Sequence, residues 1–193
     1  MAGASTERYT PVAIALHWLI AILLVGQLAG GFYMHGLPKE QAELKFELYQ
    51  LHKSFGVTIL FLTLIRLGWR LTHRAPALPD AMAAWEKAAA RGAHAGFYVL
   101  LVALPLAGWL VVSASPLADS VPTYLFGVIP WPHLPFFEGV EDRRALSHEI
   151  AEIHEYLAFA MIALIVLHLG AALKHQFINR DGVLGRMLPF LKV

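Results

Sequence analysis

The chain has 193 residues, of which 58% are hydrophobic and 15% are charged, and its formal net charge is +1. Soluble domains have about 45–50% apolar and about 25% charged residues, so this chain needs a solvent other than water. The small net charge gives no argument for a nucleic-acid partner. With no cysteine, the chain cannot form disulfides, thiolate zinc sites, iron–sulfur clusters or covalent c-type haem. Its ten histidines are the main candidate metal ligands.

Four segments are apolar enough to cross a bilayer, which takes about 20 residues as a helix. They lie near residues 11–34, 48–71, 92–112 and 148–173. The first runs on too long for a cleavable signal peptide and lacks an A-x-A-like exit, so we interpret it as a retained span. The expected fold is therefore all-α, an integral membrane four-helix bundle that forms a single domain over residues 1–193.

The basic residues are unevenly divided between the two sides of the predicted membrane. Ten of the 15 fall with the two termini and the connection between spans two and three: Arg8, Arg66, Arg70, Arg74, Lys87, Arg91, Lys174, Arg180, Arg186 and Lys192. The remaining five are on the other side: Lys39, Lys45, Lys53, Arg143 and Arg144. The positive-inside rule then predicts that both termini are cytoplasmic.

The two longer connections differ in character. Residues 72–91, on the inner side, carry two prolines and an Ala-rich stretch around Trp85, which predicts a short interfacial helix. Residues 113–147, on the outer side, contain five prolines and many aromatic side chains. This long outer segment is expected to lie as a cap on the outer membrane surface, because aromatic residues favour that interface.

Four histidines lie inside the predicted spans: His17, His52, His154 and His168. An ionisable side chain at membrane depth is costly and indicates function by default. The plain alternative is an interhelical hydrogen bond, a use of histidine that recurs in membrane bundles.

Depth and helical phase favour a metal centre over that alternative. His154 and His168 are 14 residues apart, about 21 Å along a helix, and face the same side. His17 and His168 lie near the inner ends of their spans, whereas His52 and His154 lie near the outer ends. The four residues thus form one pair per leaflet. Zinc or copper needs three or four ligands at one depth, whereas haem iron needs only two histidines. The pattern predicts two haem b groups, one in each leaflet.

Neighbouring residues fit this interpretation. Gly56, on the same face as His52, would leave room for a flat macrocycle, although close helix packing would also explain it. Met161, midway between His154 and His168, would be an axial ligand or, as we favour, pack between the haems. Cationic partners for the haem propionates are also available near the membrane surfaces. The candidates are Arg8, Lys53, Arg66 and Arg70, each of which the positive-inside rule also explains.

The remaining histidines give weaker signals. His94 at the predicted start of span three, and His175 at the inner boundary, are candidates for relaying protons to a quinone. His73 is interpreted as an ordinary interfacial histidine. Three others are assigned to solvated outer segments: His35, His133 and His148.

Four stretches of the chain look familiar: ALHWLIAILLVGQLAGGFYM, LHKSFGVTILFLTLIRLGWRL, HAGFYVLLVALPLAGWLVVSAS and IHEYLAFAMIALIVLHLGAALKHQF. They cover all four spans and resemble the bacterial cytochrome b561 family. The HW pair, the HKSFG opening and the H-x13-H spacing together are fairly specific to that family. It implies a four-helix membrane bundle with two b haems, with ligands at His17, His52, His154 and His168.

The resemblance also implies an activity. Similar proteins include a superoxide oxidase, which takes an electron from superoxide outside and passes it to ubiquinone, so a bacterial inner-membrane location is expected. A related branch serves hydrogenases and formate dehydrogenases as a haem subunit. The chain departs from the compact oxidase in its longer outer loop, which would dock a partner or cover the outer haem. The alternative is therefore an electron-transfer subunit for a periplasmic dehydrogenase, a hydrogenase or a small secreted partner. A haem-free structural bundle is the third hypothesis.

Overall fold

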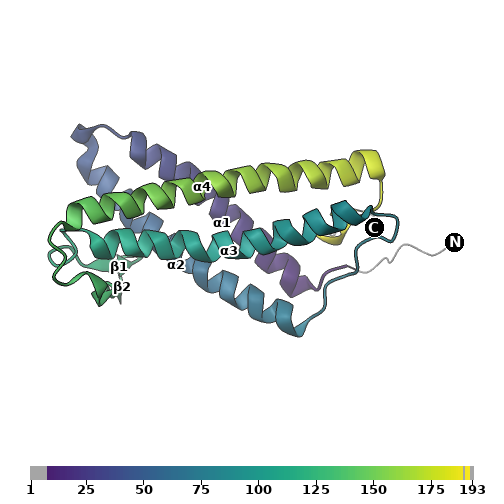
Figure 1. The fold of residues 1–193 in the computed structure, drawn as a ribbon, viewed down its shortest axis with the longest axis horizontal. Coiled ribbons are helices and arrows are strands. Elements are labelled where there is room, and N and C mark those ends of the chain that lie inside the picture. The colour runs from purple at the N-terminus through teal and green to yellow at the C-terminus, as the bar shows by residue number, and fades with distance from the viewer. Residues whose placement is uncertain (1–7, 189, 192–193) are drawn as a thin grey trace.

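The computed structural model describes residues 8–188 and 190–191, and this part of the chain contains four helices long and apolar enough to cross a membrane (Figure 1). Their bounds are α1 Pro11–Gly36, α2 Ala42–Thr72, α3 Ala84–Ala114 and α4 Arg143–Lys174. The protein is thus a multi-pass, all-α membrane protein, as the sequence predicts. Lys192, counted above among the basic residues, lies outside the described residues.

The helix starts follow ordinary capping chemistry. Thr10 Oγ1 accepts a hydrogen bond from the Ala13 N–H (3.3 Å), and Pro11 occupies the first turn of α1, where its missing N–H costs nothing. Asp142 caps α4 by accepting from the Ala145 N–H (2.9 Å). Each helix extends beyond the predicted span. The prediction of a separate interfacial helix around Trp85 is wrong, because this Ala-rich stretch forms the first turns of α3.

The helices pack in chain order, α1 along α2, α2 along α3 and α3 along α4. Within the described residues, α4 has at most sparse backbone contact with α1 and α2. One buried apolar cluster joins all four helices near mid-height, and its members are Ile20, Leu24, Ile59, Leu101, Leu104 and Met161. Because most side chains of the spans are exposed or only half-buried, the buried core of the bundle is small.

The outer connection folds into a small hairpin of β1 (Thr123–Leu125) and β2 (Ile129–Trp131), with Leu125 opposite Ile129. Two buried serines of the spanning helices anchor it. Ser54 Oγ on α2 accepts from the Phe126 N–H (2.8 Å), and Ser113 Oγ on α3 accepts from the Leu134 N–H (3.0 Å). The predicted outer cap is therefore fastened to the outer half of α2 and to the last turn of α3.

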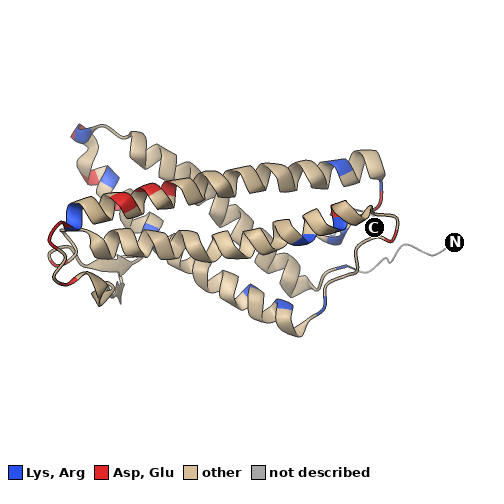
Figure 2. Ribbon diagram, viewed as in Figure 1, with Lys and Arg blue, Asp and Glu red and all other residues tan. Residues whose placement is uncertain are grey.

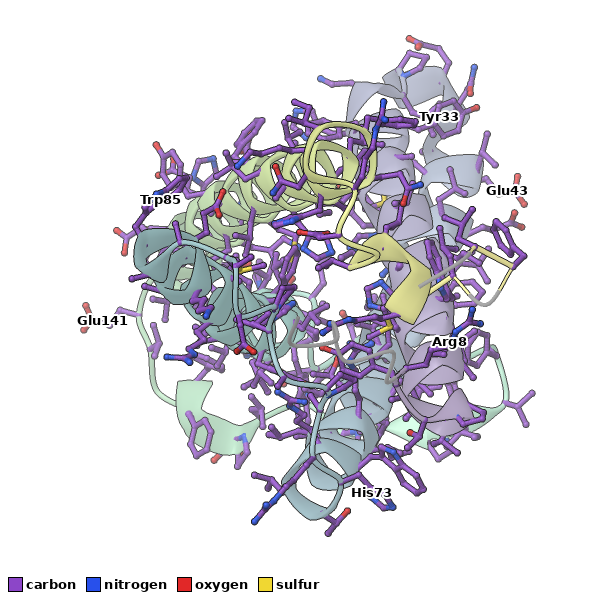
Figure 3. All side chains as sticks on the ribbon, turned by 90° about the vertical axis from the view of Figure 1, so that its right-hand side faces the viewer. Arg8, Tyr33, Glu43, His73, Trp85 and Glu141 are labelled. Carbon is purple, nitrogen blue, oxygen red and sulfur yellow. The ribbon has the colours of Figure 1, made fainter. Side chains whose placement is uncertain are left out.

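At the opposite end, the chain after α4 turns back beneath the bundle. A π-helical turn, His175–Asn179, and a 3-10 turn, Leu184–Arg186, lead it there. The buried Arg186 donates to the Ala77 carbonyl (2.5 Å), and the Trp18 indole donates to the Met187 carbonyl (2.9 Å). Figure 3 looks onto this end, where the C-terminal segment crosses the helix ends. It ties α1, the α2–α3 connection and α4 together.

Charged residues collect at the two ends of the bundle and leave its middle almost uncharged (Figure 2). The acidic side chains gather mainly at the end that carries the hairpin, and α4 contributes Glu149, Glu152 and Glu155 there. The start of α1 and the segment that follows α4 lie at the opposite end (Figure 1). The charge-free middle is the part of the bundle that suits a hydrocarbon core.

Replacing the buried Ser113 by alanine tests the anchoring of the outer connection. Ser113→Ala removes the acceptor of the Leu134 N–H, and we expect the free energy of unfolding in detergent to fall by about 1–3 kcal/mol. Ser120→Ala is the matched control, because Ser120 is exposed and its hydroxyl bonds only to the Leu117 carbonyl. Equal unfolding midpoints for the two variants would contradict the anchoring role.

Candidate functional site

The outer histidine pair joins α2 to α4. The ring centres of His52 and His154 are 6.3 Å apart, with the ring planes at 72°. His154 Nδ1 donates to the Leu104 carbonyl (3.0 Å), a bond that places the proton on Nδ1 and leaves the Nε2 lone pair available. The backbone carbonyl of His52 accepts from the Gln27 amide (2.7 Å), which holds α2 against α1 at this level. The His154 ring is thus held by α3, and the backbone at His52 is held by α1.

The inner pair joins α1 to α4. The rings of His17 and His168 are also 6.3 Å apart, at an interplanar angle of 65°. Phe97 contacts His168 edge-on at 5.2 Å, and the His94 ring lies 6.0 Å from His168. His94 stands about 15 Å along α3 from its first residue, so the expectation that it begins this helix is wrong. Three imidazoles therefore gather at the inner level, and the His94 ring lies slightly closer to His168 than the His17 ring does.

The separation of the rings fits a metal bound between them. Two imidazole–metal bonds of about 2 Å each account for about 4 Å of the 6.3 Å. The rest of the separation is made up of two short distances, one in each ring, from the ligating nitrogen to the ring centre. Among the described residues, no group of three or more His, Cys, Asp or Glu side chains could hold a metal ion. Each level thus offers two axial ligands, which suits haem iron, whose macrocycle supplies four nitrogens.

The bundle also has the shape that a flat macrocycle requires. Both pairs are made by α4 with a helix that it does not pack closely against, α2 at the outer level and α1 at the inner. Between the levels, Met161 is fully buried in the apolar cluster, as expected for the packing role rather than the ligand role. The two candidate sites are therefore separated by a dry layer.

Two glycines, Gly108 and Gly31, face the outer imidazoles, whereas the sequence suggests Gly56 for this position. A Cβ at Gly108 would lie 3.3 Å from His154 Cε1, and one at Gly31 would lie 3.7 Å from His52 Cε1. Gly56 instead faces the Gln27 amide, 3.5 Å from its own ideal Cβ position. Gly108 and Gly31 were missed because only their position on a different helix brings them to the histidines.

Two of the predicted cationic residues have other partners in the structure, and two lie near the inner histidines. Lys53 donates to Thr123 Oγ1 of the outer hairpin (3.1 Å), and Arg8 donates to the Leu191 carbonyl (2.8 Å). Arg66 is within electrostatic reach of the three inner histidines, and Arg70 is within reach of His94. Their role beside haem propionates stays a prediction.

A sequence model of the family described as prokaryotic cytochrome b561 matches residues 8–190. The chain belongs to this family. It is 33% identical over 182 residues to cytochrome b561 homolog 2 of Escherichia coli (strain K12), covering 94% of this chain and 92% of that protein. It is 28% identical to cytochrome b561 homolog 1 of the same strain, over 95% of this chain and 98% of that one. It is also 25% identical to the probable superoxide oxidase CybB of Yersinia pestis, over 95% and 97%.

Membership settles the general character of the site. Cytochromes b561 are membrane electron-transfer proteins that bind haem b, and the two imidazole pairs are the candidates for holding it here. When bound, haem b supplies a centre that gains and loses one electron. The residues of this chain determine where that centre lies and what surrounds it.

Gly108→Ala tests the fit at the outer level. The new methyl group would press on a ring that the Leu104 carbonyl already holds, and overpacking of this kind typically costs about 1–3 kcal/mol. We therefore expect less haem b per protein, measured by absorbance. Gly26→Ala is the control, because its Cβ meets nothing within 4 Å. A full haem content in Gly108→Ala would show that His154 does not need this space.

Proposed function

We propose that this protein binds two haem b groups and carries electrons across the bacterial inner membrane, from superoxide at the periplasmic face to ubiquinone. The single observation that carries the proposal is the repetition of one geometry: two histidine pairs, each 6.3 Å between ring centres, in opposite halves of the bundle. Bis-histidine ligation explains both pairs with one principle. A pair of structural hydrogen bonds between histidines would not require equal spacing.

The proposed roles of the residues follow from their contacts. His52 and His154 would ligate the outer iron, and His17 and His168 the inner iron. The Leu104 carbonyl would fix the tautomer and orientation of His154. The apolar cluster around Met161 would exclude water between the two levels. Since these levels are about 21 Å apart along α4, each electron step would be shorter than the whole membrane.

The net reaction balances with two superoxide anions. They lose one electron each and leave as two dioxygen molecules, while ubiquinone gains two electrons and two protons to become ubiquinol. Superoxide enters this proposal because one relative bears the name probable superoxide oxidase. The five basic residues of the outer side would attract the anion, with Lys53 the one next to an outer histidine.

Protons for the quinone would come from the inner face, which we propose is cytoplasmic because most basic residues, the start of α1 and the segment after α4 lie there. His175 Nδ1 is 2.5 Å from Asp181 Oδ2 and 3.2 Å from the Asn179 amide, and the side chain of His175 is 11% exposed. A histidine held by a carboxylate is suited to pass protons. His94, beside His168, is the second proposed relay residue.

A second candidate function is that of an electron-transfer subunit for a periplasmic dehydrogenase, a hydrogenase or a small secreted partner. The observation that favours it is Phe136, which lies on a 3-10 turn of the outer connection and is 72% exposed. Apolar side chains that project from an outer surface favour contact with another protein. In this case superoxide would be irrelevant, and a protein donor would co-purify from native membranes.

The superoxide proposal predicts that superoxide accelerates the reduction of ubiquinone. In protein reconstituted in liposomes with ubiquinone, an enzymatic superoxide source should accelerate ubiquinol formation, and superoxide dismutase should remove the acceleration. Rapid mixing with optical detection of haem b reduction measures the first step. Quinone reduction that is no faster with superoxide than without it would contradict this function and favour the second candidate.

The proposed proton relay predicts that removing its histidine slows the reduction of quinone but leaves the reduction of haem b unchanged. His175→Ala should slow quinone reduction by about 100-fold, the lower end of what a positioned proton-transfer group contributes. Reduction of haem b by superoxide and the haem spectrum should be unchanged. His73→Ala is the control, since His73 also lies at the inner end but stacks on Trp69 at 3.8 Å. Equal quinone rates in the two variants, or an unaltered pH profile in His175→Ala, would exclude the relay.

A further inference from the structure

The outer hairpin exposes an apolar tip. Residues 120–137 contain no Asp, Glu, Lys or Arg. At the tip, Val128 is 77% exposed, Ile129 56% and Phe126 48%. A loop bathed in water normally places polar residues at such positions, and a contiguous apolar patch marks an interaction surface. The tip of the hairpin therefore offers an apolar interaction surface.

The position of the hairpin suggests which partner. The Trp131 ring lies 6.2 Å from Phe61 and 5.0 Å from Trp109, on the flanks of α2 and α3. Phe61 is nine residues beyond His52 on α2, about 13 Å deeper into the membrane, and is 51% exposed on the outside of the span. The base of the hairpin thus reaches down the lipid-facing side of the bundle, and it continues the surface that the spans present to lipid.

The tip is also held in a fixed direction. Phe126 has φ of 51°, a left-handed conformation that a bulky residue rarely adopts, followed by Gly127 at φ of 72°. Two contacts with α2 stabilise it: the Phe126 N–H donates to Ser54 Oγ (2.8 Å), and its ring meets Phe55 edge-on at 5.2 Å. Because contacts with α2 fix the conformation of this turn, the apolar tip points in a defined direction.

The backbone of the hairpin suits an environment with little water. Polar backbone groups in contact with lipid must find partners within the protein. The two strands pair with each other, and the Val128 N–H donates to the Leu125 carbonyl across the turn (3.0 Å). Pro130 and Pro132 have no N–H to satisfy, and the Pro132 carbonyl accepts from the Trp109 indole (2.9 Å).

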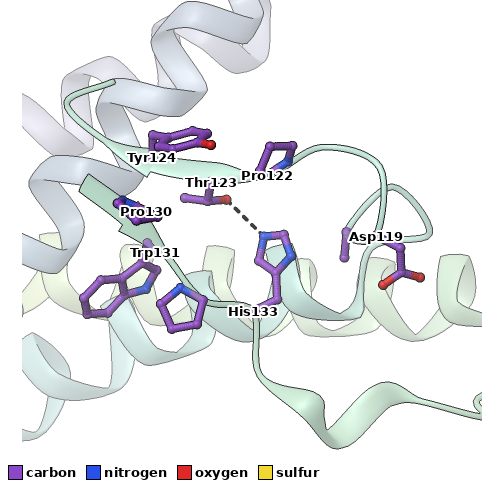
Figure 4. Close-up of a pocket in the computed structure, with 9 residues that line it drawn as sticks. Asp119, Pro122, Thr123, Tyr124, Pro130, Trp131 and His133 are labelled. Carbon is purple, nitrogen blue, oxygen red and sulfur yellow. Dashed lines mark hydrogen bonds between the residues drawn. The ribbon is translucent and has the colours of Figure 1, made fainter. Parts of the chain in front are cut away.

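The other side of the hairpin carries several polar side chains among apolar ones (Figure 4). There a cavity of about 510 Å³ is lined by Asp119, Thr123 and His133, among others. Thr123 Oγ1 accepts from Lys53 and lies 3.1 Å from His133 Nε2. The hairpin is therefore two-sided, with polar groups on the wall near the outer end of the bundle and a wholly apolar tip at its flank. This division suits the boundary between headgroups and acyl chains.

We propose that the hairpin is a membrane anchor inserted into the outer leaflet, with Phe126, Val128 and Ile129 in contact with lipid acyl chains. This inference stands apart from the identity of the electron donor. A protein partner on the same patch is the competing occupant, but the patch is continuous with the lipid-facing flanks of α2 and α3. In a membrane, the apolar flanks of these spans would be covered by lipid.

Because the chain has no cysteine, a single nitroxide label can be placed on it without further changes. Val128→Cys and Ile129→Cys carry the label at the tip, and Glu138→Cys, an exposed acidic position of the same connection, is the control. Purified protein in lipid nanodiscs is measured by electron paramagnetic resonance. Collision rates are compared for oxygen, which partitions into lipid, and for a neutral nickel chelate, which stays in water. A monodisperse elution profile and an unchanged helical spectrum confirm that each variant folds.

We expect the ratio of oxygen to nickel collision rates to exceed one at positions 128 and 129 and to fall below one at position 138. Ratios below one at all three positions would place the tip in water and overturn the proposal. Low rates with both reagents at 128 and 129 would mean that protein covers the tip, which would also overturn it.

Discussion

The structure depends on α4, because this helix supplies one imidazole to each of the two histidine pairs. His154 and His168 are 14 residues apart on one face, so the rise of the helix alone fixes the levels at which His52 and His17 must meet them. A slip of α4 by one residue would turn both rings away together. The rest of the fold can be understood as holding this helix at one height and one rotation while keeping it apart from α1 and α2.

Several contacts meet that requirement. Along its length α4 packs on α3, and the Leu104 carbonyl of α3 orients the His154 ring. At the outer end, Arg143 bonds to the Ser113 carbonyl (2.9 Å) and pairs with Asp119 (2.7 Å). At the inner end, Lys174 forms an ion pair with Glu86. Between these fixed ends, the apolar cluster around Met161 fills the middle of the bundle. A family that moves electrons through membranes needs such rigidity, because the distances between its centres govern transfer.

Much of this arrangement was predictable because it depends on local geometry. Helical rise is set within one segment, so the depth of a residue follows from its distance to the end of its own span. His17 and His168 could therefore be matched in depth before any packing was known. Features that depend on contacts between segments could not. Gly108 faces His154 only because α3 lies beside α4, and the hairpin forms because serines on two helices accept its N–H groups. The start of α3 was placed too late because a charged, Ala-rich turn is a good helix former that hydropathy overlooks.

The central claim is that each histidine pair holds one haem b, and counting haem in single variants tests it most directly. Haem per protein, measured after extraction, should be two in the unaltered protein and one in both His154→Ala and His168→Ala, with a single and different midpoint potential remaining in each. The variant lacking both residues should bind none. Two haems retained in either single variant, or the same potential remaining in both, would contradict the account.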